Sequence, residues 1–203
     1  MPRMVASPHH TIYLVRHGDT EWSPVRRLAG RKDLALTATG ELNAKQLGQR
    51  LAGIAFDRVW TSPLSRARRT AELAGFGDRA IIDDRIIEMD FGSYEGRMTV
   101  DIRNERPGWG YLKDGCPDGE GPEDLGRRVD SFLATWNGLT GTSLIFAHGV
   151  ILRVMAARYL GFPAGVGRNF MLKPSSISIL GYDEIDDAPA IVAWNDHGHA
   201  TFV

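Results

Sequence analysis

The 203-residue chain has a formal net charge of −1, with 43% hydrophobic and 24% charged residues. This balance suits one globular domain over residues 1–203 and gives no overall attraction to nucleic acid or to an anionic membrane. A single cysteine, Cys116, excludes an internal disulfide, so we expect a cytoplasmic protein. No apolar run reaches the roughly 18 residues that span a bilayer. Residues 1–10 are predicted to be a loose tail, without the hydrophobic core of a signal peptide.

The first part of the chain alternates between apolar runs typical of buried strands and segments with helical periodicity. A predicted strand over residues 11–16 precedes a helix over 38–52, whose apolar positions recur at helical spacing. A second strand over 58–61 leads into a helix over 64–74. A short apolar run at 80–82 is a third predicted strand.

The middle of the chain is rich in glycine and turn-forming residues. Residues 88–97 read EMDFGSYEGR and are predicted to be a loop. A short helix near 98–105 follows, and the stretch KDGCPDGEGP over 113–122 is predicted to be a surface loop rather than a linker between domains.

The last part returns to the alternating pattern. An amphipathic helix over 123–139, an apolar strand over 143–147 and an apolar helix over 149–160 are followed by two late strands, 176–180 and 191–194. Because strands alternate with helices, we predict an α/β fold. Its expected form is a three-layer sandwich with a mostly parallel central sheet, helices on both faces and one antiparallel edge strand.

Two histidines stand directly after apolar strands, and each is followed by glycine. They are His17 in LVRHG and His148 in LIFAHG. Ligands in such sheets bind at the carboxyl ends of parallel strands. If the two strands are neighbours, the two imidazoles meet there with Arg16 and Arg66. Forked guanidinium groups match phosphate oxygens. Each feature alone is ordinary, since a histidine at a strand end is usually structural and a basic helix face is usually solvated. Their joint occurrence favours an anion-binding site.

Five motifs extend this pattern and occur in a fixed order: LVRHGDTEWS, LTATG, SPLSRARRTA, EMDFGSYEG and AHG. Together they resemble the histidine phosphatase superfamily, in its phosphoglycerate-mutase-like branch. The resemblance runs from about residue 11 to 150 and more weakly to the end of the chain. Within the family, the chain is most similar to small-molecule acid phosphatases and sugar-bisphosphate phosphatases.

The resemblance implies a catalytic role for five side chains. His17 would be the nucleophile and would form a phosphohistidine. Arg16, Arg66 and His148 would hold the phosphoryl oxygens and stabilise the charge that develops on them. Glu88 would protonate the departing alkoxide and then act as the base for water. In this reading the cations replace a metal ion, and we expect neither a metal nor a cofactor.

The resemblance also implies contacts to the substrate beside the two arginines, at Thr20, Ser23, Ala29, Gly30 and Gly149. Ser23 stands where many mutases carry Asn, so its contact differs. Ala29 stands where mutases place a small polar residue before Gly30, so that contact is expected to be weaker. The second motif reads His-Gly-Val rather than His-Gly-Gly, which leaves Gly149 as a backbone donor.

The function implied is a metal-independent phosphatase that hydrolyses small phosphomonoesters of the sugar phosphate or phosphoglycerate type. The alternative is a cofactor-dependent phosphoglycerate mutase, which must exclude water from the same phosphohistidine. The interval between Glu88 and His148 is short for a mutase, which favours hydrolysis. A non-catalytic module that binds a phosphorylated ligand is a third reading, and the presence of all five catalytic positions speaks against it.

Residues 88–122 are expected to cover the substrate. Four cations of this region are candidates for binding a second anionic group of the substrate, and the plain alternative is that they are surface charges: Arg97, Arg103, Arg106 and Lys113. The expected partner is a small phosphorylated metabolite, with no nucleic acid and no membrane. A symmetric homodimer is the default expectation for oligomeric state.

Overall fold

The computed structural model describes residues 10–200, and the rest of the predicted tail, residues 1–9, lies outside the described residues. The strands are β1 (His10–Arg16), β2 (Arg58–Thr61), β3 (Ala80–Ile82), β4 (Gly141–Ala147), β5 (Ile177–Asp183) and β6 (Ala188–Asp196). The α-helices are α1 (Ala38–Leu51), α2 (Ser65–Leu73), α3 (Thr99–Glu105), α4 (Tyr111–Asp114), α5 (Pro122–Leu133) and α6 (Gly149–Tyr159). None of the helices described is long and apolar enough to cross a membrane.

The six strands of the described chain form one sheet in the order β3-β2-β4-β1-β5-β6. The pairs β2–β3, β2–β4 and β1–β4 are parallel. At one edge the sheet becomes antiparallel, because β5 runs against β1 and β6 runs against β5. The predicted mostly parallel α/β sheet with an antiparallel edge is confirmed.

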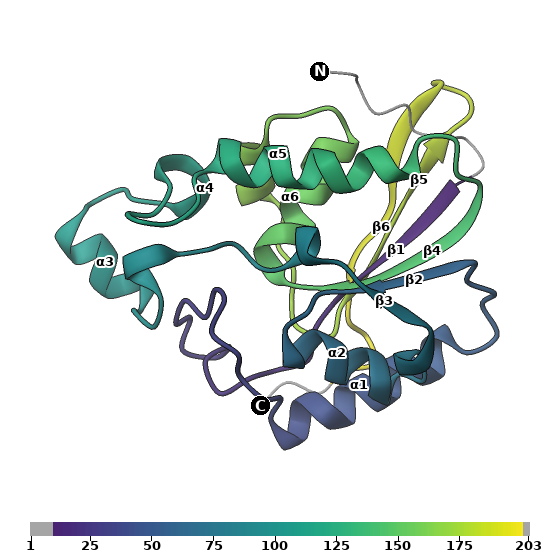
Figure 1. The fold of residues 1–203 in the computed structure, drawn as a ribbon, viewed down its shortest axis with the longest axis horizontal. Helices are drawn as coiled ribbons and strands as arrows, with labels where there is room; N and C mark the ends of the chain where they lie inside the picture. The colour runs from purple at the N-terminus through teal and green to yellow at the C-terminus, as the bar shows by residue number, and fades with distance from the viewer. Residues whose placement is uncertain (1–9, 201–203) are drawn as a thin grey trace.

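Helices cover both faces of the sheet (Figure 1). On one face α1 and α2 pack on the strands through a cluster that includes Leu47, Ala71 and Phe146. On the other face α5 and α6 bury a larger cluster around Leu125, Phe132 and the apolar side chains of α6. The predicted three-layer sandwich is therefore confirmed, with a hydrophobic core on each side of the sheet.

Some element boundaries differ from the predictions. His10, predicted to end the tail, is the first residue of β1, and its buried ring lies 2.8 Å from the hydroxyl of Ser143. The helix expected to run to residue 139 ends at Leu133 and tightens into the 3-10 helix η4 (Ala134–Trp136). The stretch predicted as a loop from residue 113 overlaps the short helix α4.

The segment between residues 88 and 122 lies beyond the carboxyl ends of the parallel strands, on the left of Figure 1. It contains the 3-10 helix η3 (Gly92–Tyr94) and the helices α3 and α4. Parallel pairing sets Arg16, the last residue of β1, beside Ala147, the last residue of β4. It also sets Thr61 at the end of β2 beside Phe146. The residues that follow these three strands therefore meet at one edge of the sheet.

Candidate active site

The register of β1 and β4 places the two strand-end histidines side by side. The backbone N–H of His17 donates to the carbonyl of Ala147 at 3.0 Å, which extends the ladder one step beyond the strands. The ring centroids of His17 and His148 are 5.1 Å apart. Both side chains are buried. The predicted convergence of the two imidazoles at the carboxyl ends of the strands is present in the structure.

Arg66, in the first turn of α2, lies between the two rings. Its Nε is 3.3 Å from Nε2 of His17 and 3.1 Å from Nδ1 of His148. Its terminal nitrogens donate to the carbonyls of Gly30 and Lys32, each at 2.7 Å. Every nitrogen of this guanidinium therefore has a partner, and the 1% exposed side chain is held in one orientation.

The hydrogen bonds decide which nitrogen of each ring carries a proton. Nδ1 of His17 lies 2.7 Å from the carbonyl oxygen of Gly18, which can only accept, so Nδ1 is protonated and Nε2 keeps its lone pair. Nδ1 of His148 faces the donor Nε of Arg66, so its proton is on Nε2, which donates to the hydroxyl of Ser62 at 2.6 Å. A hydrogen bond from the backbone of Gly18 to Thr70 further supports the turn that follows β1.

Both histidines are neutral at pH 7. Burial lowers the pKa of His17 well below its ordinary value of 6.5, and the positive charges of Arg66 and Arg16 lower it further. Burial also lowers the pKa of His148 well below 6.5, again with Arg66 as the next cause. His17 thus presents an unprotonated Nε2, the form of imidazole that acts as a nucleophile.

Arg16 supplies the unsatisfied donor of the site. Its Nη1 donates to the carbonyl of Leu172 at 2.5 Å, but its buried Nε has no hydrogen-bond partner among the described residues. A Cβ on Gly149 would lie 3.3 Å from Cζ of Arg16, so this glycine leaves room for the guanidinium at the start of α6. A buried N–H without a partner costs free energy, and an anionic oxygen would satisfy it.

Glu88 places a carboxylate at the N-terminus of α6. Its Oε1 accepts from the backbone of Met89 and Ile151, each at 3.0 Å, and its Oε2 accepts from Val150 at 3.1 Å. Burial lowers the pKa of both Arg16 and Arg66, and the Glu88 charge is the largest influence opposing that change. The five predicted catalytic side chains thus form one cluster that is coupled by hydrogen bonds or by charge.

The predicted substrate contacts divide into two groups. Gly149 and Gly30 border the arginines, although the carbonyl of Gly30 acts as an acceptor for Arg66. Thr20 and Ser23 instead bond each other, with 3.1 Å between their hydroxyl oxygens. The carbonyl of Ala29 accepts from the backbone of Lys32 within its own turn. In the described structure these last three residues build the loop beside the site.

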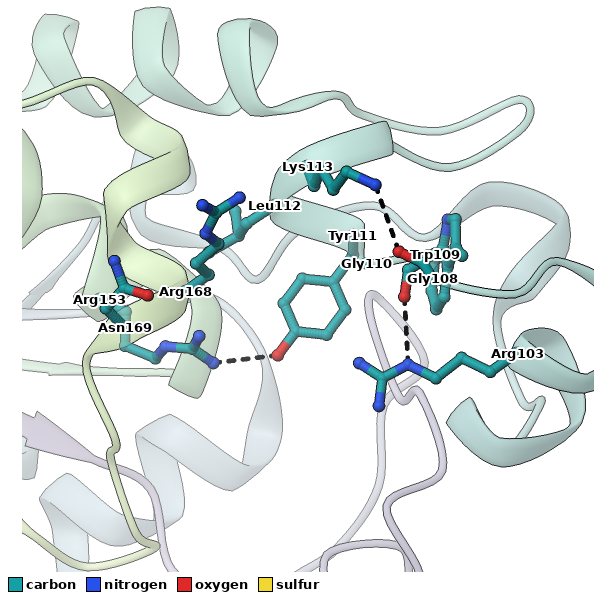
Figure 2. Close-up of a pocket in the computed structure, with 10 residues that line it drawn as sticks. All are labelled: Arg103, Gly108, Trp109, Gly110, Tyr111, Leu112, Lys113, Arg153, Arg168 and Asn169. Carbon is teal, nitrogen blue, oxygen red and sulfur yellow. Dashed lines mark hydrogen bonds between the residues drawn. The ribbon is translucent and has the colours of Figure 1, made fainter.

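Two of the four cations suggested for a second anionic group face a common cavity, and two do not. Arg97 pairs with Glu105, and Arg106 donates to the hydroxyl of Tyr94. The other two contribute to a cavity of about 390 Å³, shown in Figure 2. It is lined by Arg103, Gly108, Trp109, Gly110, Tyr111, Leu112, Lys113, Arg153, Arg168 and Asn169.

Several residues of the site were not predicted from the sequence. Ser62 orients His148, and its place in the SPLSRARRTA motif was the available signal. Arg128 donates to the carbonyls of Ile87 and Glu88 and so holds the Glu88 loop. Arg153 and Arg168 come from segments after the second histidine, where no motif marked them. Among residues 10–200, no three or more His, Cys, Asp or Glu side chains gather in an arrangement that could hold a metal ion.

Comparison with known proteins identifies the family. The family model of the histidine phosphatase superfamily (branch 1) matches residues 12–197, which include every side chain of the cluster. The chain belongs to the histidine phosphatase superfamily. The resemblance seen in the sequence motifs is therefore confirmed at the level of the family.

Relatives of the chain include proteins named as a mutase and as a phosphatase. A probable phosphoglycerate mutase GpmB from Salmonella arizonae is 37% identical over 183 residues, or 85% of each chain. The solved structure of the Rv3214 reading frame of Mycobacterium tuberculosis is 32% identical, with a TM-score of 0.86 over 92% of this chain and 97% of that one. A putative alpha-ribazole-5'-P phosphatase from Escherichia coli is 27% identical, with a TM-score of 0.81 over 96% and 98%.

Proposed function

We propose that this member of the histidine phosphatase superfamily hydrolyses small phosphomonoesters without a metal ion, through a phosphohistidine on His17. The observation that carries the proposal is the neutral ring of His17. Its unprotonated Nε2 accepts a hydrogen bond from Arg66 and belongs to the cluster that also contains Arg16 and His148. A nucleophile that is unprotonated at neutral pH and surrounded by phosphate-binding cations suits in-line attack on phosphorus.

In the first step Nε2 of His17 forms a bond to phosphorus while the bond from phosphorus to the ester oxygen breaks. The unsatisfied Nε of Arg16 and the guanidinium of Arg66 stabilise charge on the remaining phosphoryl oxygens. Glu88 in its acid form gives its proton to the departing alkoxide. Oε2 of Glu88 accepts only one amide hydrogen, whereas Oε1 accepts two, so Oε2 has a lone pair left for that proton.

In the second step water attacks the phosphohistidine. The Glu88 carboxylate takes a proton from the water as its oxygen bonds to phosphorus, and the bond to His17 Nε2 breaks. Inorganic phosphate leaves, and both His17 and Glu88 return to their starting forms. A small phosphorylated metabolite in the cytoplasm is the substrate that this proposal requires. A homodimer and a single domain over residues 1–203 stay predictions.

The test is phosphate release from small phosphomonoesters in the presence of a chelator. We expect release by the native protein and none by His17→Ala, while His197→Ala is the matched control. The ring of His197 contacts Asn195 and Lys173 rather than the site. Release that depends on an added metal ion, or that survives in His17→Ala, would overturn the proposal.

Glu88→Gln separates the two chemical steps. With p-nitrophenyl phosphate the leaving group needs no proton, so this variant should release one equivalent of nitrophenol and then stall as phosphoenzyme. With an alkyl phosphate both steps should be slow. Equal slowing of the burst and of the later turnover with p-nitrophenyl phosphate would remove Glu88 from the role of base.

A phosphoglycerate mutase activity is the second candidate, because the 37% identical relative carries that name. It shares the first half of the reaction and differs in returning the phosphoryl group to the substrate. Conversion of 3-phosphoglycerate to 2-phosphoglycerate, measured with and without 2,3-bisphosphoglycerate, separates the two. Isomerisation faster than phosphate release would favour the mutase.

A further inference from the structure

The cavity of about 390 Å³ between α4, α6 and the segment before β5 has a strongly one-sided charge. Its ten lining residues include four cations and no carboxylate: Arg103, Lys113, Arg153 and Arg168. Its remaining walls include the ring of Tyr111 and the side chain of Leu112. A small concave site with apolar walls and a few charged groups is typical of a metabolite-binding pocket.

Most of the positive charge of this cavity is not paired with carboxylates. The Nε of Arg103 donates to the carbonyl of Trp109, and Arg153 donates to the hydroxyl of Tyr111 (Figure 2). Arg153 also donates to the carbonyl of Gly167, so both arginines bond neutral oxygens. Lys113 lies 3.6 Å from its neighbour Asp114. The exposed side chain of Arg168 has no hydrogen bond or ion pair with any residue between 10 and 200.

Arg153 is pre-oriented for a ligand. Its Nε donates to Gly167 at 2.9 Å and its Nη1 to the Tyr111 hydroxyl at 2.9 Å, while its guanidinium carbon lies 5.9 Å from the centre of the Tyr111 ring. These contacts fix the plane of the guanidinium and leave Nη2 without a bond to the described residues. A planar fork held in this way loses little side-chain entropy when it binds an anion.

The cavity adjoins the phosphoryl site. Arg153 follows Gly149 by four positions in α6, so the two share one face of the helix. Arg168 and Asn169 come shortly before Leu172, whose carbonyl holds Arg16. The positive charge of Arg153 helps to lower the pKa of Arg16, which places the two guanidinium groups within electrostatic range of each other.

We propose that this cavity binds a second anionic group of the substrate, a carboxylate or a second phosphate, with Arg153 and Arg168 as its principal contacts. The inference rests on the proposed phosphatase function and narrows its substrates to small phosphomonoesters that carry another negative charge. Arg103 and Lys113 contribute to the same positive field from the other wall of the cavity.

Two pairs of substrates isolate the second charge. 3-Phosphoglycerate and glycerol 3-phosphate differ in a carboxylate, and fructose 1,6-bisphosphate and fructose 6-phosphate differ in a phosphate. The native protein should show about 10–100-fold higher kcat/KM for the doubly anionic member of at least one pair, the range expected for a charged hydrogen bond. The pair that responds identifies the anion.

Arg153→Ala should reduce that ratio to within about threefold of unity, and Arg168→Ala should reduce it partly. Because the Arg168 side chain is exposed and makes no hydrogen bond or ion pair with residues 10–200, its variant tests the proposal even if Arg153→Ala does not fold. Arg127→Ala is the matched control. Arg127 lies on α5, pairs with Asp124 and should keep the native ratio.

The possible failures are distinguishable. Hydrolysis of both members of both pairs at equal kcat/KM would overturn the subsite and leave the phosphatase standing. If no ester is hydrolysed, the proposed function fails, and calorimetry of the His17→Ala protein still tests the cavity. Equal affinity for 3-phosphoglycerate and glycerol 3-phosphate, together with equal affinity for the two fructose phosphates, would then overturn the inference.

Discussion

The hydroxyl oxygen of Ser62 lies 2.6 Å from Nε2 of His148, directly behind the ring nitrogen that faces the site. In the described structure Nδ1 of His148 accepts from Arg66, so Nε2 donates to Ser62. A phosphoryl oxygen in the site would require Nδ1 to donate instead. A hydroxyl can reverse its role and donate to Nε2, so Ser62 supports either tautomer of a neutral ring.

Ser62→Ala should therefore lower kcat/KM about tenfold, corresponding to one hydrogen bond of about 1.4 kcal/mol. The loss should be smaller at pH values where His148 can take up a proton and donate without help. The pH profile of kcat/KM for native and variant proteins measures this. A uniform loss at every pH would indicate a purely structural role for Ser62.

Substitution by alanine should affect phosphate binding at Gly149 and stability at Gly18. A Cβ at position 149 meets the Arg16 guanidinium at 3.3 Å, whereas one at position 18 lies 2.6 Å from the carbonyl oxygen of Gly40. Gly149→Ala should weaken phosphate binding about tenfold with little change in stability, because alanine suits a helix. Gly18→Ala should lower the free energy of unfolding by about 1–3 kcal/mol. Calorimetric titration with phosphate and urea unfolding separate these effects.

Acid should destabilise the protein through its buried histidines. The folded-state pKa values of His17 and His148 lie below 6.5, so the unfolded chain binds more protons as pH falls through 6.5. The contribution of the two neutral histidines to the free energy of unfolding is therefore complete above pH 6.5. It is lost as the pH falls below 6.5, by up to about 1.4 kcal/mol per pH unit for each histidine. Urea unfolding between pH 7.5 and 5 should show that the free energy of unfolding falls less steeply with pH in His17→Asn than in the native protein. An unchanged dependence on pH would contradict the assignment of His17 as neutral.

Arg128 should matter for both stability and activity. It forms a two-point ion pair with Glu120 at 2.8 and 2.7 Å, and it donates to the carbonyls of Ile87 and Glu88. Arg128→Ala leaves the mostly buried carboxylate of Glu120 with only Arg31, at 3.9 Å, as a charged partner, and should cost about 3 kcal/mol of unfolding free energy.

The neighbouring Arg127 is the control for this variant. Its exposed pair with Asp124 should contribute less than about 1 kcal/mol. Denaturant unfolding of both alanine variants, with kcat measured on the folded fraction, checks the prediction. Equal stability of the two variants would show that Arg128 does not anchor the loop of Glu88.

Much of the fold and the site follows from local sequence pattern. The apolar runs before His17 and His148 indicate strands, and the two rings meet because these strands are parallel neighbours in the sheet. Arg66 could be placed because its helix begins right after a strand that joins the same edge. The sequence therefore predicts the mostly parallel sheet and the histidine cluster, whereas the order of the strands comes from the structure.

The remaining features depend on contacts between distant segments. His10 lies in β1 because its ring meets Ser143, a residue 133 positions away, and its own neighbours are polar enough to resemble a tail. In the sequence Arg153 is a single charged residue in an apolar helix. Its role becomes visible only through its hydrogen bonds to Tyr111 and Gly167, which are distant in the chain. Periodicity reports which face of an element is buried, but not which remote residue covers it.

The unpartnered N–H of Arg16 has a consequence for the end of the reaction cycle. The donors that would hold the phosphoryl group of an ester have the same charge and geometry for free phosphate, because that group is the same in both. Release of the product then leaves the buried Nε of Arg16 without a hydrogen-bond partner again. Phosphate is therefore expected to compete with substrate, so the phosphate level around the protein would set the fraction of sites available for turnover.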